Sequence, residues 1–396
     1  MPSQEPDGAA PSGPPAAGNG VRAVLGAAEA ALGSRLYEAA DLGGSTRSTV
    51  LRCRSENHGS VVVKAYADDP AALGAFTAEA AGLSLGLAGP GLLAAAPGLP
   101  LIVMRDLGSG PTLADLLLGA DRAAAQDALL SWSRALGALA AGSVAYEAEF
   151  DARVERYRRG HPTWIEGTSI LGIVGRLPEL LDRAGMAAPP GLDADIAEIR
   201  ALADSPYTGL TPGDTCPDNS MLTADGMQLL DFEGSGYQPV FLTAAYCRMP
   251  FATCWCAFRL PGNIGRRAEA AFRRRLLPVY PALADDAVWG PGMLRAVAAW
   301  SVMTLGALRY AAEGDYPLHS TRRPAPMSRQ LLTYRWESLL RELESTGELP
   351  AFAELLRRLL ADRAGVWQPE PLPAFPALSR ATSQPQDIAL KRAHYT

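Results

Sequence analysis

The sequence predicts a two-lobed α+β fold, in which a small antiparallel-sheet lobe precedes a larger, mainly helical lobe. A chain of 396 residues is long enough for two lobes, each with its own hydrophobic core. Strand-like runs and helices alternate up to about residue 107, whereas helical patterns cover 112–200 and 265–365. Between the two helical stretches, residues 207–233 have the pattern of strands and loops.

The two ends of the chain differ in composition from the rest. Residues 1–20 are rich in Pro, Gly and Ala, and we expect them to be disordered. We place the first lobe at 21–107 and the second at 108–365. The Pro-rich tail at 366–396 is expected to be either docked or disordered.

Charge and cysteine content narrow the class of protein. A net charge of −6 argues against a general nucleic-acid binder, because affinity for phosphate backbones comes from concentrated Lys and Arg. The N-terminus lacks the basic and apolar regions of a signal peptide, and the five cysteines form no disulfide-like framework. We therefore expect a cytoplasmic protein. The longest charge-free run, 80–104, contains prolines and glycines that would break a membrane-spanning helix.

The first lobe is predicted to contain a helix, a hairpin, a second helix and a further strand. An Ala/Leu/Val pattern over 22–40 indicates a short helix, and residues 42–48 indicate a Gly-containing turn. Strand-like runs at 49–54 and 60–66 flank a polar, Gly-bearing turn, which predicts a β-hairpin. The apolar run 101–104 predicts another short strand.

Two of the predicted helices have capping residues at their starts. Asp69 is a suitable N-cap because Pro70 follows it at the first helical position. That helix is expected to end near 86–89. Thr112 and Asp115 match a capping-box pattern in front of a Leu/Ala-rich helix.

The segment 211–233 carries most of the candidate chemistry. Asp225 and Gly226, flanked by apolar runs, are a strong signal for a β-hairpin. A three-residue loop would place Asn219 directly opposite Asp231, so that two oxygen ligands meet at the open end. A two-residue turn would shift the register by one residue and make that pair diagonal.

Oxygen ligands of this kind suit Mg²⁺, which binds through one or two protein groups together with substrate phosphates. Asp214 precedes Asn219 by a short loop, which brings it to the same end of the hairpin. In phosphoryl transfer one carboxylate orients the attacking hydroxyl and takes its proton, while metal ions neutralise the phosphates. Asp214 is therefore the candidate base, and Asn219 and Asp231 are the candidate metal ligands.

Lysine is rare in this chain, and one lysine follows three valines in a predicted strand. Of the 36 basic residues, only Lys64 and Lys391 are lysine. A lysine at a position expected to be buried therefore needs a specific explanation. Lys64 is a candidate functional cation. The alternatives are a surface residue at the strand end or a Schiff-base lysine, and nothing else in the sequence supports the latter.

The order Asp-x4-Asn followed by Asp-Phe-Glu resembles the aminoglycoside phosphotransferase family, whose members are related to protein kinases. The two motifs lie at 214–219 and 231–233, and the resemblance covers about residues 35–260. Their joint order is more specific than either motif alone. The resemblance implies a kinase-like fold and an enzyme that uses ATP and Mg²⁺ to phosphorylate a hydroxyl group.

The resemblance also implies roles for residues of the first lobe. Lys64 would contact the α- and β-phosphates, and Glu79 on the next helix would be its ion-pair partner. Backbone groups around Arg105 and Leu107 would contact adenine. The loop that covers the phosphates would be formed by Gly43, Gly44, Ser45 and Thr46.

Two features depart from the family pattern. Pro212 replaces the His that precedes Gly-Asp, so the packing of that imidazole must be supplied by other groups. The loop at 43–48 has two glycines and supplies hydroxyls in place of further glycine turns. Neither change removes the base or a metal ligand, so both bear on turnover more than on the fold.

The acceptor is left open by the sequence. The resemblance implies a small molecule, such as an aminoglycoside-like antibiotic or a biosynthetic metabolite, with 150–205 forming much of its binding wall. A Ser or Thr of a peptide, phosphorylated during natural-product maturation, is a rival acceptor. A catalytically silent nucleotide-binding protein is a rival from another class, and Pro212 is its main support. The sequence specifies neither whether the phosphoryl donor is ATP or GTP nor the oligomeric state.

Several other residues have competing explanations. Asp214, Asn219 and Asp231 are also plausible as turn or cap residues. Glu233 is either a further metal or substrate ligand or a solvated loop acid. The arginines of 322–329 either lie on a solvated surface or contact an anionic substrate group.

Two sequence patterns point to chemistry that we reject. Cys247, Cys254 and Cys256 are expected to be buried thiols on an apolar helix, because neither a Cys-x-x-Cys pair nor a nearby His supports a metal site. The letters of 82–86 match the nucleophile elbow of a hydrolase. They fall at the end of a predicted helix with no strand leading into them, which argues against that enzyme class.

Overall fold

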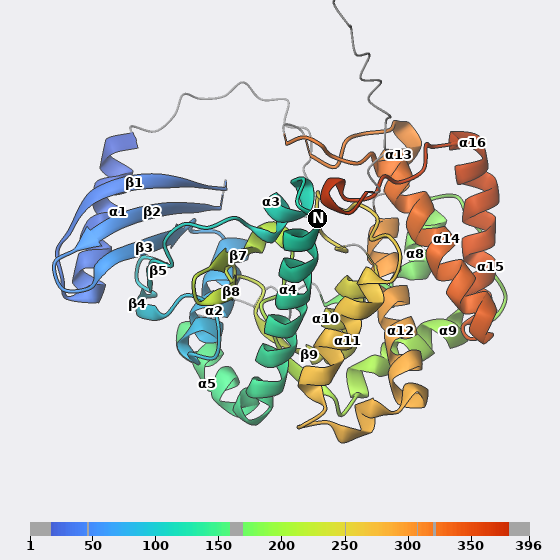
Figure 1. Cartoon of the computed structure of the whole chain (residues 1–396), viewed down its shortest axis with the longest axis horizontal. Helices are drawn as coiled ribbons and strands as arrows, with labels where there is room; N and C mark the ends of the chain where they lie inside the picture. Colours follow the sequence, from blue (N-terminus) through green and yellow to red (C-terminus); the bar gives the residue numbers. More distant parts are fainter. Residues whose placement is uncertain are drawn as a thin grey trace, which may run out of the picture.

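The computed structural model has two lobes, a sheet lobe formed by the first part of the chain and a helical lobe formed by the rest (Figure 1). This confirms the two-lobed α+β fold predicted from the sequence. The structure describes residues 17–45, 47–158, 169–249, 251–306, 308–319 and 322–379.

The sheet lobe is built on a five-stranded antiparallel sheet with the strand order β1-β2-β3-β5-β4. Two helices pack on this sheet. The elements are α1 (Ala17–Leu32), β1 (Leu36–Ser45), β2 (Ser48–Ser55), β3 (Gly59–Tyr66), α2 (Pro70–Ser84), β4 (Leu92–Ala96) and β5 (Leu101–Arg105).

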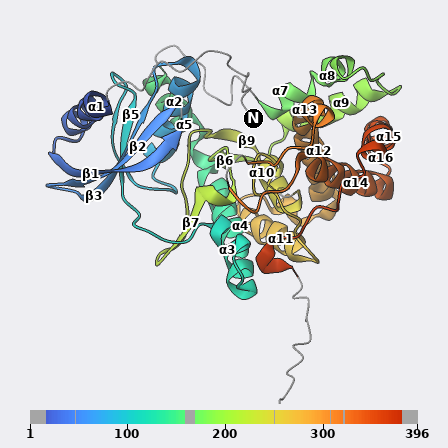
Figure 2. The same cartoon turned by 90° about the horizontal axis from the view of Figure 1, so that it is seen from above.

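The alternation of side chains along β3 assigns each to one face of the sheet. Val61 and Val63 belong to the buried cluster that includes the inner side of α1. Tyr66 belongs to the main core, together with residues of α2, so Lys64 shares the α2 face. The two helices lie on opposite sides of the sheet when it is viewed from above (Figure 2). The period of two thus directs Lys64 toward α2.

The predicted helix over 22–40 is wrong in its second half. Helix α1 ends at Leu32, and Gly33, at φ +67°, follows with its amide donating to Glu29 at 2.8 Å. The Glu29 carboxylate then accepts from the Leu36 amide at 2.7 Å, which starts β1. A glycine in the left-handed region is a common helix stop, and this one was not used as a signal.

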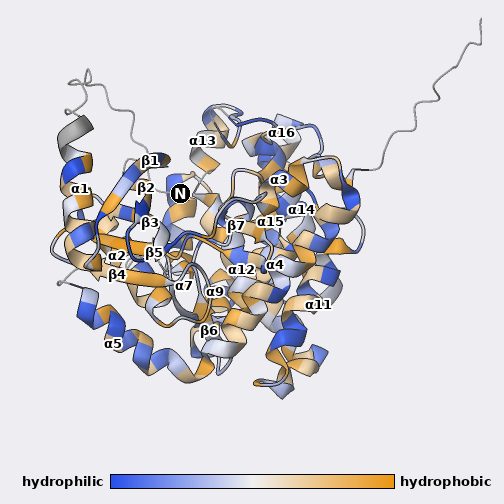
Figure 3. Cartoon of the chain, turned by 60° about the vertical axis from the view of Figure 1, so that its left-hand side comes forward, coloured by the Kyte–Doolittle hydropathy of each residue, from blue (hydrophilic) through white to orange (hydrophobic). Residues whose placement is uncertain are grey.

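Two other details of the sheet lobe differ from the sequence prediction. Residues 42–45 extend β1, so the turn begins only after Ser45. A Cβ on Gly44 would lie 2.2 Å from the Ser48 carbonyl oxygen, so the close return of β2 requires glycine there. Strand β4 was not predicted because its sequence, LLAAA, has no β-branched or aromatic residue. Its hydrophobic character is visible in Figure 3.

Helix α2 has the predicted start and a slightly earlier end. The Asp69 carboxylate accepts from the amides of Ala71 and Ala72, both at 3.0 Å. The helix ends at Ser84, whose hydroxyl donates to the Ala81 carbonyl at 2.8 Å. Residues 82–86 therefore lie at a helix end, as expected, and form no strand-to-helix elbow.

The helical lobe packs its helices around a core to which α4, α10, α11 and α12 contribute. Short strands lie on its side facing the sheet lobe (Figure 1). Its helices are α3 (Leu113–Leu118), α4 (Arg122–Ser143), α5 (Glu147–Tyr157), α7 (Ile170–Val174), α8 (Leu177–Arg183), α9 (Leu192–Arg200), α10 (Val240–Arg248), α11 (Ile264–Leu276), α12 (Asp286–Leu305), α13 (Leu308–Glu313), α14 (Ser328–Thr346), α15 (Pro350–Leu359) and α16 (Gly365–Trp367). Its strands are β6 (Thr208–Thr211), β7 (Ser220–Thr223), β8 (Gly226–Leu229) and β9 (Gly236–Pro239).

The capping box predicted at the start of α3 is present. The Thr112 hydroxyl accepts from the Asp115 amide at 3.0 Å, and the Asp115 carboxylate accepts from the Thr112 amide at 2.8 Å. Among the described residues, one helical stretch, 122–157, is long and apolar enough to cross a membrane. Half of its most apolar window is buried inside the fold, as in a core helix.

The Pro-rich tail is docked as far as the structure describes it. The Arg259 amide donates to Pro373 at 2.9 Å, and the Phe375 amide donates to Arg259 at 3.2 Å. The Phe375 ring is fully buried against Phe251 and Phe258. The rest of the tail and most of the predicted disordered N-terminus lie outside the described residues, although α1 begins at Ala17, before the predicted boundary.

Candidate active site

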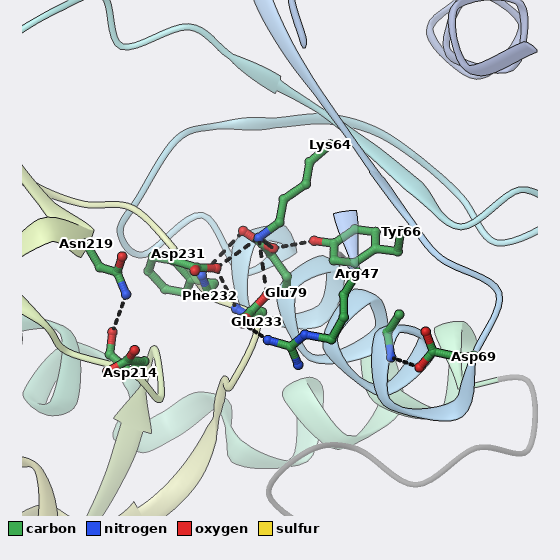
Figure 4. Close-up of polar contacts among 11 residues, drawn as sticks. Arg47, Lys64, Tyr66, Asp69, Glu79, Asp214, Asn219, Asp231, Phe232 and Glu233 are labelled. Carbon is green, nitrogen blue, oxygen red and sulfur yellow. Dashed lines mark hydrogen bonds and ion pairs between the residues drawn. The ribbon is translucent and has the colours of Figure 1, made fainter. Parts of the chain in front are cut away.

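Lys64 links the two lobes through ion pairs with three carboxylates (Figure 4). Its Nζ atom lies 2.6 Å from Glu79 of α2 and 2.9 Å from Asp231 of the helical lobe. A longer pair, at 3.7 Å, connects it to Glu233. Burial alone would lower the pKa of Lys64, but the three carboxylates outweigh burial and raise it. Lys64 is therefore a permanently charged, buried cation at the junction of the lobes.

Glu79 is held by several donors. It is 2% exposed and accepts from Lys64, from the Tyr66 hydroxyl and, at 3.3 Å, from the Phe232 amide. Tyr66 lies two residues after Lys64 on the same face of β3, so the strand period already pointed to it, although it was not predicted. The Phe232 contact ties Glu79 to the backbone of the Asp-Phe-Glu segment.

The Phe232 ring fixes that segment against α2. Phe232 is fully buried, and a Cβ on Gly82 of α2 would lie 3.3 Å from the ring and 2.5 Å from the Ser235 hydroxyl. A Cβ on Gly89 would approach the ring to 2.6 Å. Glycine at position 82 of α2 and at position 89 after it therefore allows this part of the sheet lobe to contact the Asp-Phe-Glu segment closely.

Arg47 is a site residue that the sequence prediction missed. It lies at the turn between β1 and β2, and its guanidinium forms an ion pair with Glu233 at 3.1 Å (Figure 4). The loop predicted to cover the phosphates thus reaches the Asp-Phe-Glu segment. Gly43 and Gly44 lie in β1 beside this turn, Thr46 lies outside the described residues, and the side chain of Ser45 is not described.

The cluster carries an excess of negative charge that fits a divalent cation. Three carboxylates, Glu79, Asp231 and Glu233, share Lys64 and Arg47 as their cationic partners. Burial raises the pKa of Glu233 above its ordinary value, and the neighbouring Asp231 raises it further. Burial likewise raises the pKa of Glu79, against the effect of Lys64. Carboxylate oxygens with uncompensated charge are the donor set that Mg²⁺ prefers.

Asn219 lies beside Asp231, but not in the predicted register. Thr223 pairs with Gly226 and Leu222 with Met227, so the β7–β8 turn has two residues and not three. The Leu230 amide donates to the Asn219 carbonyl at 2.9 Å, and Asp231 is consequently the diagonal neighbour of Asn219. The prediction that the two face each other directly is wrong, because only Ala224 and Asp225 form the turn, which is the two-residue alternative that the sequence left open.

The Asn219 side chain is oriented by the loop that precedes it. Its amide nitrogen donates to the Asp214 carbonyl at 3.1 Å, and its oxygen points away from Asp214 (Figure 4). This leaves the acceptor oxygen of Asn219 as a group that could hold a metal ion together with Asp231.

Asp214 is held by a chain of hydroxyl groups. Thr253 donates to the Asp214 carboxylate at 2.6 Å, and Tyr246 lies 3.0 Å from the Thr253 hydroxyl. Because the single Thr253 proton goes to Asp214, Tyr246 must be the donor to Thr253. Burial raises the pKa of Asp214, although hydrogen bonds from Cys216 and Thr253 oppose this shift. A raised pKa suits a carboxylate that accepts a proton from an attacking hydroxyl.

Thr253 should act as a positioning residue for Asp214. We expect Thr253→Val to lower kcat by about 10–100-fold, the effect of losing one hydrogen bond to a charged group, with KM for ATP unchanged. Thr253→Ser keeps the hydroxyl and should retain most of the activity. Steady-state kinetics on both variants test this, and equal losses in the two would contradict the role.

Gly213 allows the loop that carries Asp214 to pass close to the Asp-Phe-Glu segment. Gly213 has φ +98°, and a Cβ there would lie 2.4 Å from the Gly234 carbonyl oxygen. The preceding strand β6 pairs with β9, which follows Gly234, so both segments are fixed. The loop that carries Asp214 is thus fixed by this backbone contact and by the hydrogen bond from Thr253.

Gly213→Ala should be strongly destabilising. Gly226 has a similar φ, +102°, but an added Cβ there would meet nothing within 4 Å. Gly226→Ala should therefore lower the free energy of unfolding by about 1–2 kcal/mol, the cost of the left-handed conformation. Gly213→Ala should cost about 1–3 kcal/mol more, because of the clash. Denaturant unfolding of the pair measures the difference, and equal losses would show that the contact is not tight.

The segment that connects the two lobes, here called the hinge, begins after β5. The Arg105 amide donates to Gly91 at 2.8 Å, so that amide is not available to a base. Asp106 accepts from Ser60 at 2.6 Å and from the Gly108 amide at 3.0 Å, which fixes the loop around Leu107. Hydrogen bonds of this kind, together with Arg52, lower the pKa of Asp106 despite its burial.

All five cysteines are buried and none forms a disulfide; for Cys247, Cys254 and Cys256 this burial was predicted. Cys247 lies on α10, but Cys254 and Cys256 lie in the loop that follows it, so their expected helical placement is wrong. Their Sγ atoms are 3.1 Å apart. Cys216, from the loop after Asp214, contacts Thr253 at 3.6 Å and so lies beside the same loop.

No protein-family model matches the sequence, and a search of curated proteins found no match. Among solved structures, the chain is similar to a macrolide 2'-phosphotransferase from Brachybacterium faecium, with 18% identity, 73% of this chain and 93% of that chain covered, and a TM-score of 0.46. The chain is also similar to a choline/ethanolamine kinase family protein from Mesorhizobium loti, with 16% identity, 86% of this chain and 99% of that chain covered, and a TM-score of 0.47. An aminoglycoside phosphotransferase is also similar, with 14% identity, 82% of this chain and 100% of that chain covered, and a TM-score of 0.43. The solved structures that this chain resembles are therefore phosphotransferases and kinases, at low sequence identity.

Proposed function

We propose that the chain is an ATP- and Mg²⁺-dependent phosphotransferase that moves the γ-phosphoryl group to a hydroxyl of a small molecule. The observation that carries this proposal is the buried Lys64, paired with Glu79 at 2.6 Å and with Asp231 at 2.9 Å across the two lobes. In protein kinases, a lysine that forms an ion pair with a helix glutamate positions the nucleotide phosphates. An aspartate that binds Mg²⁺ completes that arrangement.

The residues of the first lobe would bind the nucleotide. Lys64, held in place by Glu79, would contact its phosphates, and the hinge around Leu107 would contact the base. Arg47, at the turn between β1 and β2, would exchange its ion pair with Glu233 for the phosphates. Magnesium, when bound, would neutralise charge on the phosphates, and Asn219, Asp231 and Glu233 are the residues that would hold it.

Asp214 would orient the acceptor hydroxyl and accept its proton. Its carboxylate is positioned by Thr253, and its raised pKa favours proton uptake. The acceptor oxygen then forms a bond to the γ-phosphorus, the bond from that phosphorus to the bridging oxygen of ADP breaks, and the proton resides on Asp214. Most of the rate enhancement in such a site comes from positioning and electrostatics.

The enzyme is proposed to act in the cytoplasm on a small-molecule acceptor. Five free, buried thiols are compatible with a reducing compartment, in which ATP and Mg²⁺ are abundant. Part of the segment expected to form the acceptor wall, 159–168, lies outside the described residues. The acceptor is therefore proposed only as a hydroxyl compound, with an aminoglycoside-like antibiotic or a biosynthetic metabolite as candidates.

A screen of hydroxyl acceptors that follows ADP release tests the proposal. The panel should contain aminoglycosides, macrolides, choline and ethanolamine, nucleosides and Ser- or Thr-containing peptides, with Asp214→Asn as the blank for each. We expect release above the blank with at least one small molecule. Release with peptides alone would favour a peptide kinase, and tight ATP binding without release would favour a silent nucleotide-binding protein.

A further inference from the structure

We propose that Cys216, Asp218 and Cys254 form a Zn²⁺ site that joins the loop carrying Asp214 to the loop carrying Thr253. The Sγ atoms of the two cysteines and one carboxylate oxygen of Asp218 all lie within 4.8 Å of one another. The inference goes beyond the proposed function and does not rest on it, because a metal site can form whether or not the chain transfers phosphate.

The spacing of the three ligand atoms is close to that of a tetrahedral zinc site. Zinc–sulfur bonds of about 2.3 Å and zinc–oxygen bonds of about 2.0–2.2 Å place neighbouring ligand atoms roughly 3.5–3.8 Å apart. A contraction of about 1 Å or less, within the reach of side-chain rotation, would bring these atoms onto one ion. Thiolate ligands select zinc over Mg²⁺, so this site would not compete with the nucleotide metal.

Asp218 is already oriented as a metal-binding carboxylate usually is. Its Oδ2 atom accepts from the Trp255 indole at 2.9 Å and from the Arg322 guanidinium at 3.0 Å. The other oxygen, Oδ1, faces the Cys254 Sγ atom at 3.9 Å. In known metal sites, hydrogen bonds donated to the carboxylate oxygen that does not bind the metal hold the ligand in its orientation. The Arg322 guanidinium, which the sequence left as either a surface group or a contact for an anionic substrate, forms an ion pair with Asp218.

A buried cation lies near the cluster and would balance the charge of a metal complex. Two thiolates, one carboxylate and one Zn²⁺ ion together carry a single negative charge. The Arg335 guanidinium is 3% exposed and donates to the carbonyls of Phe251 and Ala252, directly before this loop. Burial lowers the pKa of Arg335 to about 10, and its neighbours Tyr246, Cys254 and Cys216 act against that shift. An anionic site would thus stabilise a buried cation.

Cys256 gives the cluster a further thiol next to Cys254. Their Sγ atoms are 3.1 Å apart, and Cys256 is fully buried. Cys256 does not belong to the group of three ligand atoms that lie within 4.8 Å of one another, so we assign it no bond to the ion. Because Thr253 precedes Cys254 and holds Asp214, the ion would restrain the base as well as the loop.

Metal analysis of the full chain, purified without chelators, tests the proposal. We expect one zinc per chain in the wild type and less than about a tenth of that in Cys254→Ser. Asp218→Asn should weaken zinc binding by at least about tenfold, as measured by competition with a chromogenic chelator. Cys53→Ser and Cys247→Ser, which change buried thiols outside the cluster, should keep the full zinc content.

A second measurement covers the case in which Cys254→Ser does not fold. Replacing the metal of the wild-type chain with Co²⁺ should produce a thiolate-to-cobalt charge-transfer band, which Zn²⁺ then removes. Zinc below about a tenth of an equivalent in the wild type, or an unchanged zinc content in folded Cys254→Ser, would overturn the proposal. An intact mass lower by two hydrogens in metal-free protein would instead identify a disulfide, which also overturns it.

Discussion

Asp214→Asn should lower kcat by about 10²–10³-fold, because the variant loses the group that orients the acceptor and takes its proton. The change keeps the size of the side chain and its place beside Thr253, so the affinity for Mg·ATP should stay within a few-fold of the wild type. Single-turnover measurements with the acceptor found by screening separate the chemical step from binding.

A matched control for this variant is Asp225→Asn. Asp225 lies exposed in the turn between β7 and β8, and the substitution makes the same chemical change outside the site. Its kcat should equal that of the wild type. Undiminished phosphoryl transfer by Asp214→Asn would remove Asp214 from the role of base.

Lys64→Met should abolish measurable transfer and also destabilise the fold. Glu79 is 2% exposed, and loss of Lys64 leaves its carboxylate buried without its ion-pair partner. Removing one member of a buried pair typically costs about 3–5 kcal/mol, which denaturant unfolding would measure as a loss of stability. The loss of activity follows from the missing contact to the nucleotide phosphates.

The double variant Lys64→Met/Glu79→Gln separates the two effects. A neutral amide at position 79 removes the uncompensated charge, so most of the lost stability should return. Transfer should remain absent, because the cation is still missing. Recovery of activity in the double variant would show that Lys64 serves only to balance Glu79.

The sequence was sufficient to predict the parts of this site that depend on local periodicity. The strand that carries Lys64 followed from its three valines, whereas Glu79 was implied as its partner only by the family resemblance; the structure brings the two together at 2.6 Å. The start of α2 followed from its capping residue. These features depend on neighbours within about twenty residues, for which sequence patterns are informative.

The remaining features depend on contacts between distant segments. Thr253 holds Asp214 from a separate loop, and no local pattern distinguishes it from other threonines. The β7–β8 register depended on whether the turn has two or three residues, which shifts every pair by one. Cys216 and Cys254 meet only because two loops pack together, so no Cys-x-x-Cys spacing could reveal them.

Calorimetric titration of the full chain with ATP, with and without Mg²⁺, tests the central claim most directly. We expect binding that is at least about tenfold tighter with Mg²⁺ than without it, and we expect this gain to be lost in Asp231→Asn. Equal affinity with and without the metal, or a metal dependence that persists in Asp231→Asn, would contradict a nucleotide site built on Lys64 and Asp231.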